Sequence, residues 1–117
     1  MNHLLILNDP PYGTERSFNG LRMAHSLAKH DPDGTVTVFL MADAVLCAKA
    51  GQKTPDGYYN CERMLRRVLT ARGRILMCGT CMDARGLGAD DMMEGPTRST
   101  MDELAQVTLA ADKVLVF

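Results

Sequence analysis

Two cysteines three residues apart, Cys78 and Cys81, are the side chains of this sequence best suited to chemistry. They follow the apolar run Ile75-Leu76-Met77, and Arg85 stands seven residues after Cys78. A cysteine that ends a buried strand, beside unpaired backbone N–H groups and an arginine, can have a lowered pKa and act as a nucleophile. We therefore expect Cys78 to be an activated thiol that is alkylated before the other cysteines, with Cys81 available to resolve a bond formed on it. A plain structural cysteine at a strand end is the alternative.

Metal and nucleotide chemistry fit the sequence poorly. Cys78 and Cys81 would supply half of a zinc site, but a structural zinc ion needs four ligands, and neither the remaining cysteines nor the histidines are paired in sequence. The loop after the first apolar run carries Asp9 and Glu15 and has no glycine-rich phosphate-binding motif. We predict no metal site and no cofactor.

The other two cysteines, Cys47 and Cys61, lie among apolar residues. Cys61 precedes Met64 and Leu65 by three and four residues, so it joins the apolar face of a helix. Free cysteine behaves as a small hydrophobe in such a position. Both cysteines are interpreted as core residues.

Length and composition limit the classes of function. A chain of 117 residues makes one domain, residues 1–117. The net charge of −1 and the aromatic content of 5% argue against a nucleic-acid-binding surface. No apolar run is long enough to span a membrane, and the short N-terminal run lacks the basic flank of a signal peptide. The sequence therefore predicts a cytoplasmic protein without a membrane partner, whose cysteines stay reduced.

Apolar runs alternate with helical patterns along the chain. Strands are expected at residues 3–7, 36–41, 75–77 and 114–117, and helical patterns at residues 18–28, 44–50, 60–72 and from Thr100 onward. Residues 86–98 look irregular, with room for one short strand. Continuous apolar strands separated by amphipathic helices are typical of a parallel sheet covered on both faces. The sequence predicts a three-layer α/β/α fold with a parallel sheet of four to five strands.

The last helix has a start signal of its own. Thr100 and Glu103 have the spacing of a capping box, in which each side chain binds the other residue's backbone N–H group. The apolar face of this helix is expected to carry Met101, Leu104, Ala105 and Thr108.

In open parallel sheets, ligands bind outside the carboxyl ends of the strands. Cys78 follows the third expected strand, so we expect its sulfur to lie beside the loop after the first strand and beside the end of the second. Within the loop at residues 51–59, Tyr58 or Tyr59 is expected to cover the pocket entrance, unless both simply pack on their own domain. The residues expected to shape the pocket are Asn8, Tyr12, Gly13, Asp43, Tyr58 and Arg85.

Five ordered blocks of residues support a family resemblance. The blocks are residues 8–15 (NDPPYGTE), 39–45 (FLMADAV), 51–53 (GQK) with Gly57-Tyr58, 78–86 (CGTCMDARG), and 103–106 (ELAQ) with 111–115 (ADKVL). Over essentially its full length the chain resembles the DsrE family, most closely its YchN-like branch. The resemblance implies a small α/β fold with a parallel sheet, assembled as trimers and hexamers. Nine methionines also suggest apolar surface that a homo-oligomer would cover.

The same resemblance implies a function for Cys78. In the sulfur-relay branches of the family, a cysteine at this place receives sulfane sulfur as a persulfide and passes it to a partner protein. Cys81 has no counterpart in the relay proteins but is typical of the YchN-like branch. Cys78 is therefore expected to act in a sulfur carrier or sulfurtransferase, with sulfur donor and acceptor proteins as partners. Two alternatives stay open: a CxxC dithiol redox protein, and a non-enzymatic oligomer that binds a small ligand.

Overall fold

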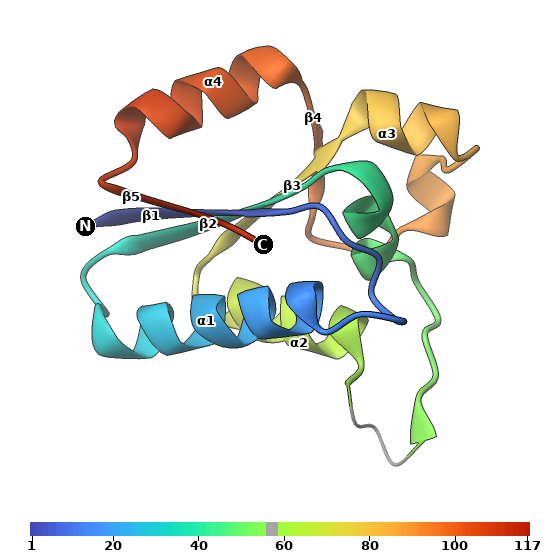
Figure 1. Cartoon of the computed structure of the whole chain (residues 1–117), viewed down its shortest axis with the longest axis horizontal. Coiled ribbons are helices and arrows are strands. Elements are labelled where there is room, and N and C mark those ends of the chain that lie inside the picture. Colours follow the sequence, from blue (N-terminus) through green and yellow to red (C-terminus); the bar gives the residue numbers. More distant parts are fainter. Residues whose placement is uncertain (56–58) are drawn as a thin grey trace.

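The computed structural model describes residues 1–55 and 59–117, which form three layers (Figure 1). The middle layer is a parallel sheet of five strands in the order β4-β3-β2-β1-β5 within these residues. The strands are β1 (Asn2–Leu7), β2 (Thr35–Leu40), β3 (Arg74–Cys78), β4 (Thr97–Ser99) and β5 (Lys113–Val116). The predicted three-layer α/β/α fold is confirmed.

Helices lie on both faces of the sheet (Figure 1). One face is covered by α1 (Arg16–His30) and α2 (Cys61–Thr70), and the other by α4 (Met101–Ala110). Helix α3 (Gly79–Ala84) follows β3 directly, and two short 3₁₀ helices are η1 (Ala42–Ala48) and η3 (Ala89–Asp91). No helix in the described ranges has the length and apolar character that a membrane span requires.

The centre of the sheet is buried because its strands are apolar on both faces. Leu5 of β1, Val38 and Phe39 of β2, and Leu76 of β3 are each at most 1% exposed. On α1, Leu21 is buried against the sheet, as its position in the predicted stripe requires. Side chains that are apolar at every strand position make a core on each side of the sheet.

The two edge strands differ from the prediction in opposite ways. β4 is the short strand for which residues 86–98 left room, although it begins only at Thr97, and it pairs with β3 through Leu76↔Thr97. β5 was expected to be covered on both faces, and that expectation is wrong. It pairs only with β1 in the described sheet, and Val114 and Val116 are 41% and 66% exposed.

Helix α4 begins as predicted but is rotated from the expected orientation. The hydroxyl of Thr100 accepts a hydrogen bond from the backbone N–H of Glu103 (3.2 Å). The Glu103 carboxylate binds Ser99 and Arg74 instead of completing the capping box. Leu104 is buried, whereas the rest of the predicted apolar face lies in solvent: Met101, Ala105 and Thr108 are exposed.

The strand order decides which loops meet. β2 lies between β1 and β3, so the loop that follows β1 is two strands away from the end of β3. Two strand spacings amount to roughly 10 Å. The residue after β3 therefore meets the segment that follows β2, not the loop that follows β1.

Candidate functional site

Cys78 is the last residue of β3 and the cap of α3. Its backbone is extended, with φ −58° and ψ 112°, and its sulfur accepts a hydrogen bond from the backbone N–H of Cys81 (3.4 Å). The buried strand brings the side chain to the carboxyl edge of the sheet with only 8% of the residue exposed. The predicted place of Cys78 at a strand end is confirmed.

Cys81 lies one turn into α3 and is half-buried. Its sulfur accepts a hydrogen bond from the backbone N–H of Ala42 (3.1 Å), and its own backbone N–H donates to the Cys78 sulfur. Ala42, the first residue of η1, has φ +51°, a left-handed conformation that costs a residue with a side chain about 1 kcal/mol. The residue with this strained backbone is the one whose N–H group donates to the Cys81 sulfur.

The surroundings of Cys78 make its thiol less acidic, not more. Burial raises the pKa of Cys78, and the hydrogen bond with the Cys81 thiol raises it further. The backbone N–H groups of Cys81 and Thr80 lower this pKa but do not outweigh the two other effects. The expected activation of Cys78 through a lowered pKa is therefore wrong for this chain, because burial and the Cys81 thiol outweigh the backbone N–H groups.

Arg85 was expected to add positive charge beside Cys78, but its side chain is bound to Asp43 and to the backbone of Cys81. Arg85 donates from Nε and Nη2 to one carboxylate oxygen of Asp43 (2.9 and 2.8 Å), and from Nη1 to the carbonyl of Cys81 (3.1 Å). This contact ties η1 to α3. The cation beside Cys78 is instead Arg98, whose pKa is raised first by its hydrogen bonds to Asp83 and to a smaller extent by Cys78.

Arg98 is held by the carboxylate of Asp83 and occupies the space that the missing side chain of Gly79 leaves free. Its guanidinium forms two parallel hydrogen bonds with Asp83 (2.9 and 2.7 Å) and lies so close over Gly79 that a Cβ atom there would be 2.7 Å from Nε. Sequence reasoning missed Arg98, because it lies in a segment without a periodic pattern. Its neighbour Ser99 pairs with Cys78 across the sheet, and only this pairing brings Arg98 to the site.

A second cluster surrounds Tyr12, in the loop after β1. The Tyr12 hydroxyl donates a hydrogen bond to the side chain of Gln52 and accepts one from the backbone N–H of Cys61 (3.3 Å). Burial raises the pKa of Tyr12. Beside it is a cleft of about 460 Å³, lined by Pro11, Tyr12, Gly13, Thr14, Glu15, Thr54, Pro55 and Tyr59. None of these lining residues belongs to the thiol pair.

Comparison with known proteins assigns the chain to a family. The model of the DsrE/DsrF-like family matches residues 1–117. This chain belongs to the DsrE/DsrF-like family. The predicted resemblance is thus confirmed, and the DsrE-family chain has 42% identity with Protein YchN of Escherichia coli (strain K12) over 97% of both chains.

A solved structure and a sulfurtransferase are also similar to this DsrE-family chain. The crystal structure of the ychN protein from E. coli superposes with a TM-score of 0.92 at 40% identity, over the whole of both chains. A sulfurtransferase, TusD of Salmonella arizonae, is 23% identical over the full length of both chains.

The residues predicted to form one pocket fall into separate groups in this DsrE-family chain. Asp43 and Arg85 lie beside Cys81, as described above, whereas Tyr12 and Gly13 line the cleft of the first loop. The Asn8 side chain donates to the carbonyl of Phe117 (3.3 Å) at the end of β5. The reason for the division is the strand order, which places β2 between the first loop and Cys78.

Tyr58 or Tyr59 was expected to cover the pocket entrance, and the structure describes Tyr59. Tyr58 lies outside the described residues. Tyr59 lines the cleft beside Tyr12, and its ring packs against Phe18 of α1 with ring centroids 4.3 Å apart. Tyr59 thus packs on its own domain, which was the alternative interpretation.

Cys47 and Cys61 are fully buried, which confirms their interpretation as core residues. The structure adds that their thiols are hydrogen-bonded to each other, and this contact together with burial raises the pKa of Cys47. The Cys61 thiol also donates to the carbonyl of Pro11 (3.5 Å). Within the described residues, no group of three or more His, Cys, Asp or Glu side chains is arranged to hold a metal ion.

The raised pKa predicts how Cys78 reacts as pH changes. Because only the thiolate is alkylated and less of it is present than in a free thiol, iodoacetamide should modify Cys78 more slowly at pH 7 than it modifies a small free thiol. The rate should rise about tenfold per pH unit and still be rising above about pH 8.5, the ordinary thiol pKa. Half-buried Cys81 should be modified before Cys78, the reverse of the order expected from sequence. Peptide mapping after timed alkylation at several pH values measures both results.

A Cys81→Ala variant is the matched control for this pH dependence. It removes the thiol that raises the pKa of Cys78 but keeps the backbone N–H that Cys78 accepts from. The rate profile of Cys78 should therefore move to lower pH. A Cys78 rate that levels off below pH 8 in the unmodified chain would contradict the prediction.

Replacing Gly79 by alanine tests the role of Arg98. The new Cβ would displace the flexible guanidinium, and the loss of a nearby cation should slow Cys78 alkylation about two- to fivefold. The Asp83–Arg98 pair is exposed, so the free energy of unfolding should change little. Gly88→Ala is the control, because a Cβ there meets only Asp91 at 3.8 Å. Equal rates of Cys78 alkylation in the two variants would show that Arg98 does not act on the Cys78 thiol.

Proposed function

We propose that this chain is a sulfur carrier that holds sulfane sulfur as a persulfide on Cys78 and passes it to the thiol of a partner protein. Membership of the DsrE/DsrF-like family and the distant similarity to a sulfurtransferase support a sulfur-relay role. The observation that carries the proposal is the pair of neighbouring free cysteines at the carboxyl edge of the sheet, where the Cys78 sulfur accepts a hydrogen bond from the backbone N–H of Cys81. This pair would work in the cytoplasm, where thiols stay reduced.

The loading step is a thiol exchange in which atoms and charges balance. The Cys78 thiolate attacks the outer sulfur of a donor persulfide, R–S–SH, a new S–S bond forms on Cys78, and the donor leaves as the thiolate RS⁻. The Cys81 N–H and the nearby guanidinium of Arg98 would stabilise negative charge on the Cys78 sulfur during this attack.

Unloading can follow two routes with different products. A partner thiolate that attacks the outer sulfur becomes a persulfide itself and releases Cys78 as a thiolate. If Cys81 attacks the inner sulfur, hydrosulfide leaves and a Cys78–Cys81 disulfide forms. Because Cys81 lies in the first turn of α3 and its backbone N–H binds the Cys78 sulfur, the second route would need no partner. The hydrogen bond from the backbone N–H of Ala42 to the Cys81 sulfur would keep this thiol in position near Cys78 until a persulfide forms.

The thiol pair also supports one competing function, a dithiol redox protein. Such a protein would cycle between the reduced pair and a Cys78–Cys81 disulfide and would keep no extra sulfur. A homo-oligomer, a trimer or hexamer, belongs to the proposal in either case, because β5 exposes apolar residues at the edge of the sheet.

Intact-mass spectrometry separates the two functions. After incubation with a low-molecular-weight persulfide and removal of the donor, a sulfur carrier gains about 32 Da per chain, the mass of one sulfur atom. Fragmentation should place the added sulfur on the peptide that contains Cys78. A loss of about 2 Da without any gain would indicate a disulfide and favour the redox protein. An unchanged mass over a range of pH would refute the sulfur carrier.

A further inference from the structure

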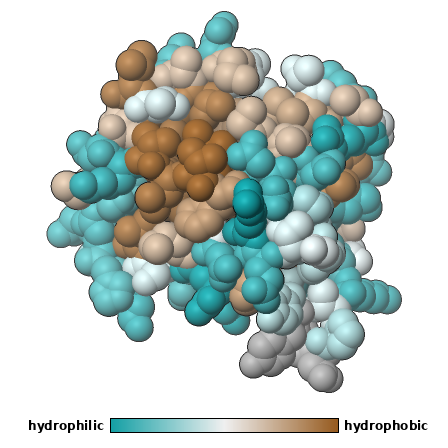
Figure 2. Space-filling model, in the orientation of Figure 1, coloured by the Kyte–Doolittle hydropathy of each residue, from teal (hydrophilic) through white to brown (hydrophobic). Residues whose placement is uncertain are grey.

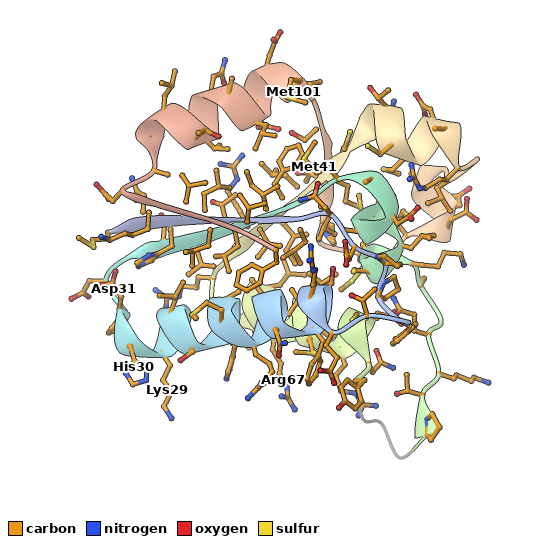
Figure 3. All side chains as sticks on the ribbon, viewed as in Figure 1. Lys29, His30, Asp31, Met41, Arg67 and Met101 are labelled. Carbon is orange, nitrogen blue, oxygen red and sulfur yellow. The ribbon has the colours of Figure 1, made fainter. Side chains whose placement is uncertain are left out.

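The outer surface of the α1/α2 layer carries a concentration of positive charge that the thiol site does not use. Residues 16–30 and 61–72 contain seven lysine and arginine residues and one acidic residue, a net charge of +6, in a chain whose total is −1. All seven cationic side chains are exposed. Figure 3 shows Lys29 and Arg67 on the side of the layer that faces away from the sheet. An anion that approaches this surface is attracted from a distance.

A hollow of about 190 Å³ lies between the two helices within this surface. Leu21, Arg22 and His25 of α1 and Met64 and Arg67 of α2 line it. Leu21 is 1% exposed and Met64 is partly buried, so the two apolar side chains belong to its inner part. The three nitrogen-bearing side chains are exposed, and no carboxylate is among the lining residues.

The nitrogen atoms around the hollow are available to a ligand. Within residues 1–55 and 59–117, the side chains of His25 and Arg67 have no hydrogen-bond or ion-pair partner. Arg22 donates from Nη1 to Asn19 (3.1 Å) and lies over the Phe18 ring, which leaves its other N–H groups for a ligand.

Most of the other arginines of the fold have a carboxylate partner, whereas Arg63 and Arg72 have none among the described residues. Arg74 is paired with Glu103, Arg85 with Asp43 and Arg98 with Asp83, each at 3.1 Å or less. On α2 itself, Arg66 is paired with Glu62 at 3.4 Å. The arginines of the hollow have no such carboxylate partner among the described residues. Two guanidinium groups that converge without a carboxylate are suited to an oxyanion, because each can donate two parallel N–H groups.

We propose that this hollow binds a small organic phosphate, with the phosphate between Arg22, His25 and Arg67 and the apolar part of the ligand against Leu21 and Met64. The charge of the layer attracts the anion, the guanidinium groups orient it, and the apolar floor selects an ester over inorganic phosphate. The site does not depend on Cys78 or Cys81, so it stands whether or not the sulfur-carrier proposal is correct.

Phenyl phosphate is the probe that tests this site. Titration into the ¹⁵N-labelled full chain should cause saturable shifts of the amide signals of the lining residues. Inorganic phosphate should bind about fivefold more weakly, since it lacks a group to cover the apolar floor, a difference of about 1 kcal/mol. An Arg22→Gln/Arg67→Gln variant should bind phenyl phosphate at least tenfold more weakly, because it loses both guanidinium groups.

A Lys29→Gln/Arg63→Gln variant is the control, because it removes the same charge from the same layer outside the hollow. Its affinity for phenyl phosphate should stay within about threefold of the unmodified chain. Equal losses in the two double variants would show that diffuse charge, not the hollow, attracts the anion and would overturn the proposal. Shifts confined to other residues would do the same, as would a glutamate-rich peptide that binds this layer while phenyl phosphate does not.

Discussion

A Cys78→Ser chain treated with a low-molecular-weight persulfide is expected to take up no sulfur. A serine hydroxyl cannot form the S–S bond that stores the sulfur, so the gain of about 32 Da should disappear altogether. The Ser side chain is close in size to that of Cys and can still accept the N–H of Cys81, so the fold and the cap of α3 should remain. Intact-mass spectrometry before and after treatment measures the result.

Three further variants make this loss specific. Cys81→Ala should keep the added sulfur and hold it longer, because the thiol that could release it as hydrosulfide is gone. Cys47→Ala and Cys61→Ala should load normally, because both thiols are fully buried. Undiminished sulfur uptake by Cys78→Ser would place the persulfide on another residue and refute the assignment.

A Val116→Lys chain is expected to lose the proposed trimer or hexamer and behave as a 12.8 kDa monomer. Val116 is 66% exposed on β5, whose outer edge has no neighbouring strand in the described sheet, and Figure 2 shows apolar surface gathered over this strand. Such an edge readily pairs with another chain, and lysine is the residue that natural edge strands use to prevent this. Light scattering coupled to size-exclusion chromatography measures the mass.

The matched control is Thr97→Lys, which places the same charge on the opposite edge strand, β4. Thr97 is also exposed, so neither substitution should change the free energy of unfolding by more than about 0.5 kcal/mol. The Thr97→Lys chain should keep the oligomer. An unmodified chain that is already monomeric at micromolar concentration would refute the proposed assembly, and dissociation by both variants would remove β5 from the interface.

The central strands could be predicted from sequence because burial acts on each residue of them. The runs at residues 3–7, 36–41 and 75–77 are apolar at nearly every position, which only a strand covered on both faces requires. β4 lacks this signal, since Thr97, Arg98 and Ser99 are polar, and it exists because β3 offers an unpaired edge. Local composition therefore predicts a strand only where the strand is apolar, as β1, β2, β3 and β5 are, and it misses a polar strand such as β4.

The residues of the candidate site also differ in whether local sequence could predict them. Cys78 could be predicted because its place depends on a local pattern, a cysteine at the end of a buried run. Arg98 could not, because it reaches Gly79 and Asp83 only through the pairing of β4 with β3. The direction of the pKa shift of Cys78 also depends on tertiary structure: a strand end suggests backbone N–H donors, but burial and the Cys81 thiol outweigh them.

The sequence by itself determined the family, the three-layer α/β/α class, the central strands and the position of the thiol pair at the end of β3. These features follow from which side chains must leave water and from short-range spacing along the chain. The tertiary structure alone decided the order β4-β3-β2-β1-β5, and with it the neighbours of each loop. Because β2 separates β1 from β3, the Cys81 thiol meets Ala42 and Arg85 meets Asp43, while Tyr12 lines a separate cleft. Which strands pair depends on side-chain packing between segments that are distant in sequence, so local spacing along the chain does not reveal which strand ends lie side by side.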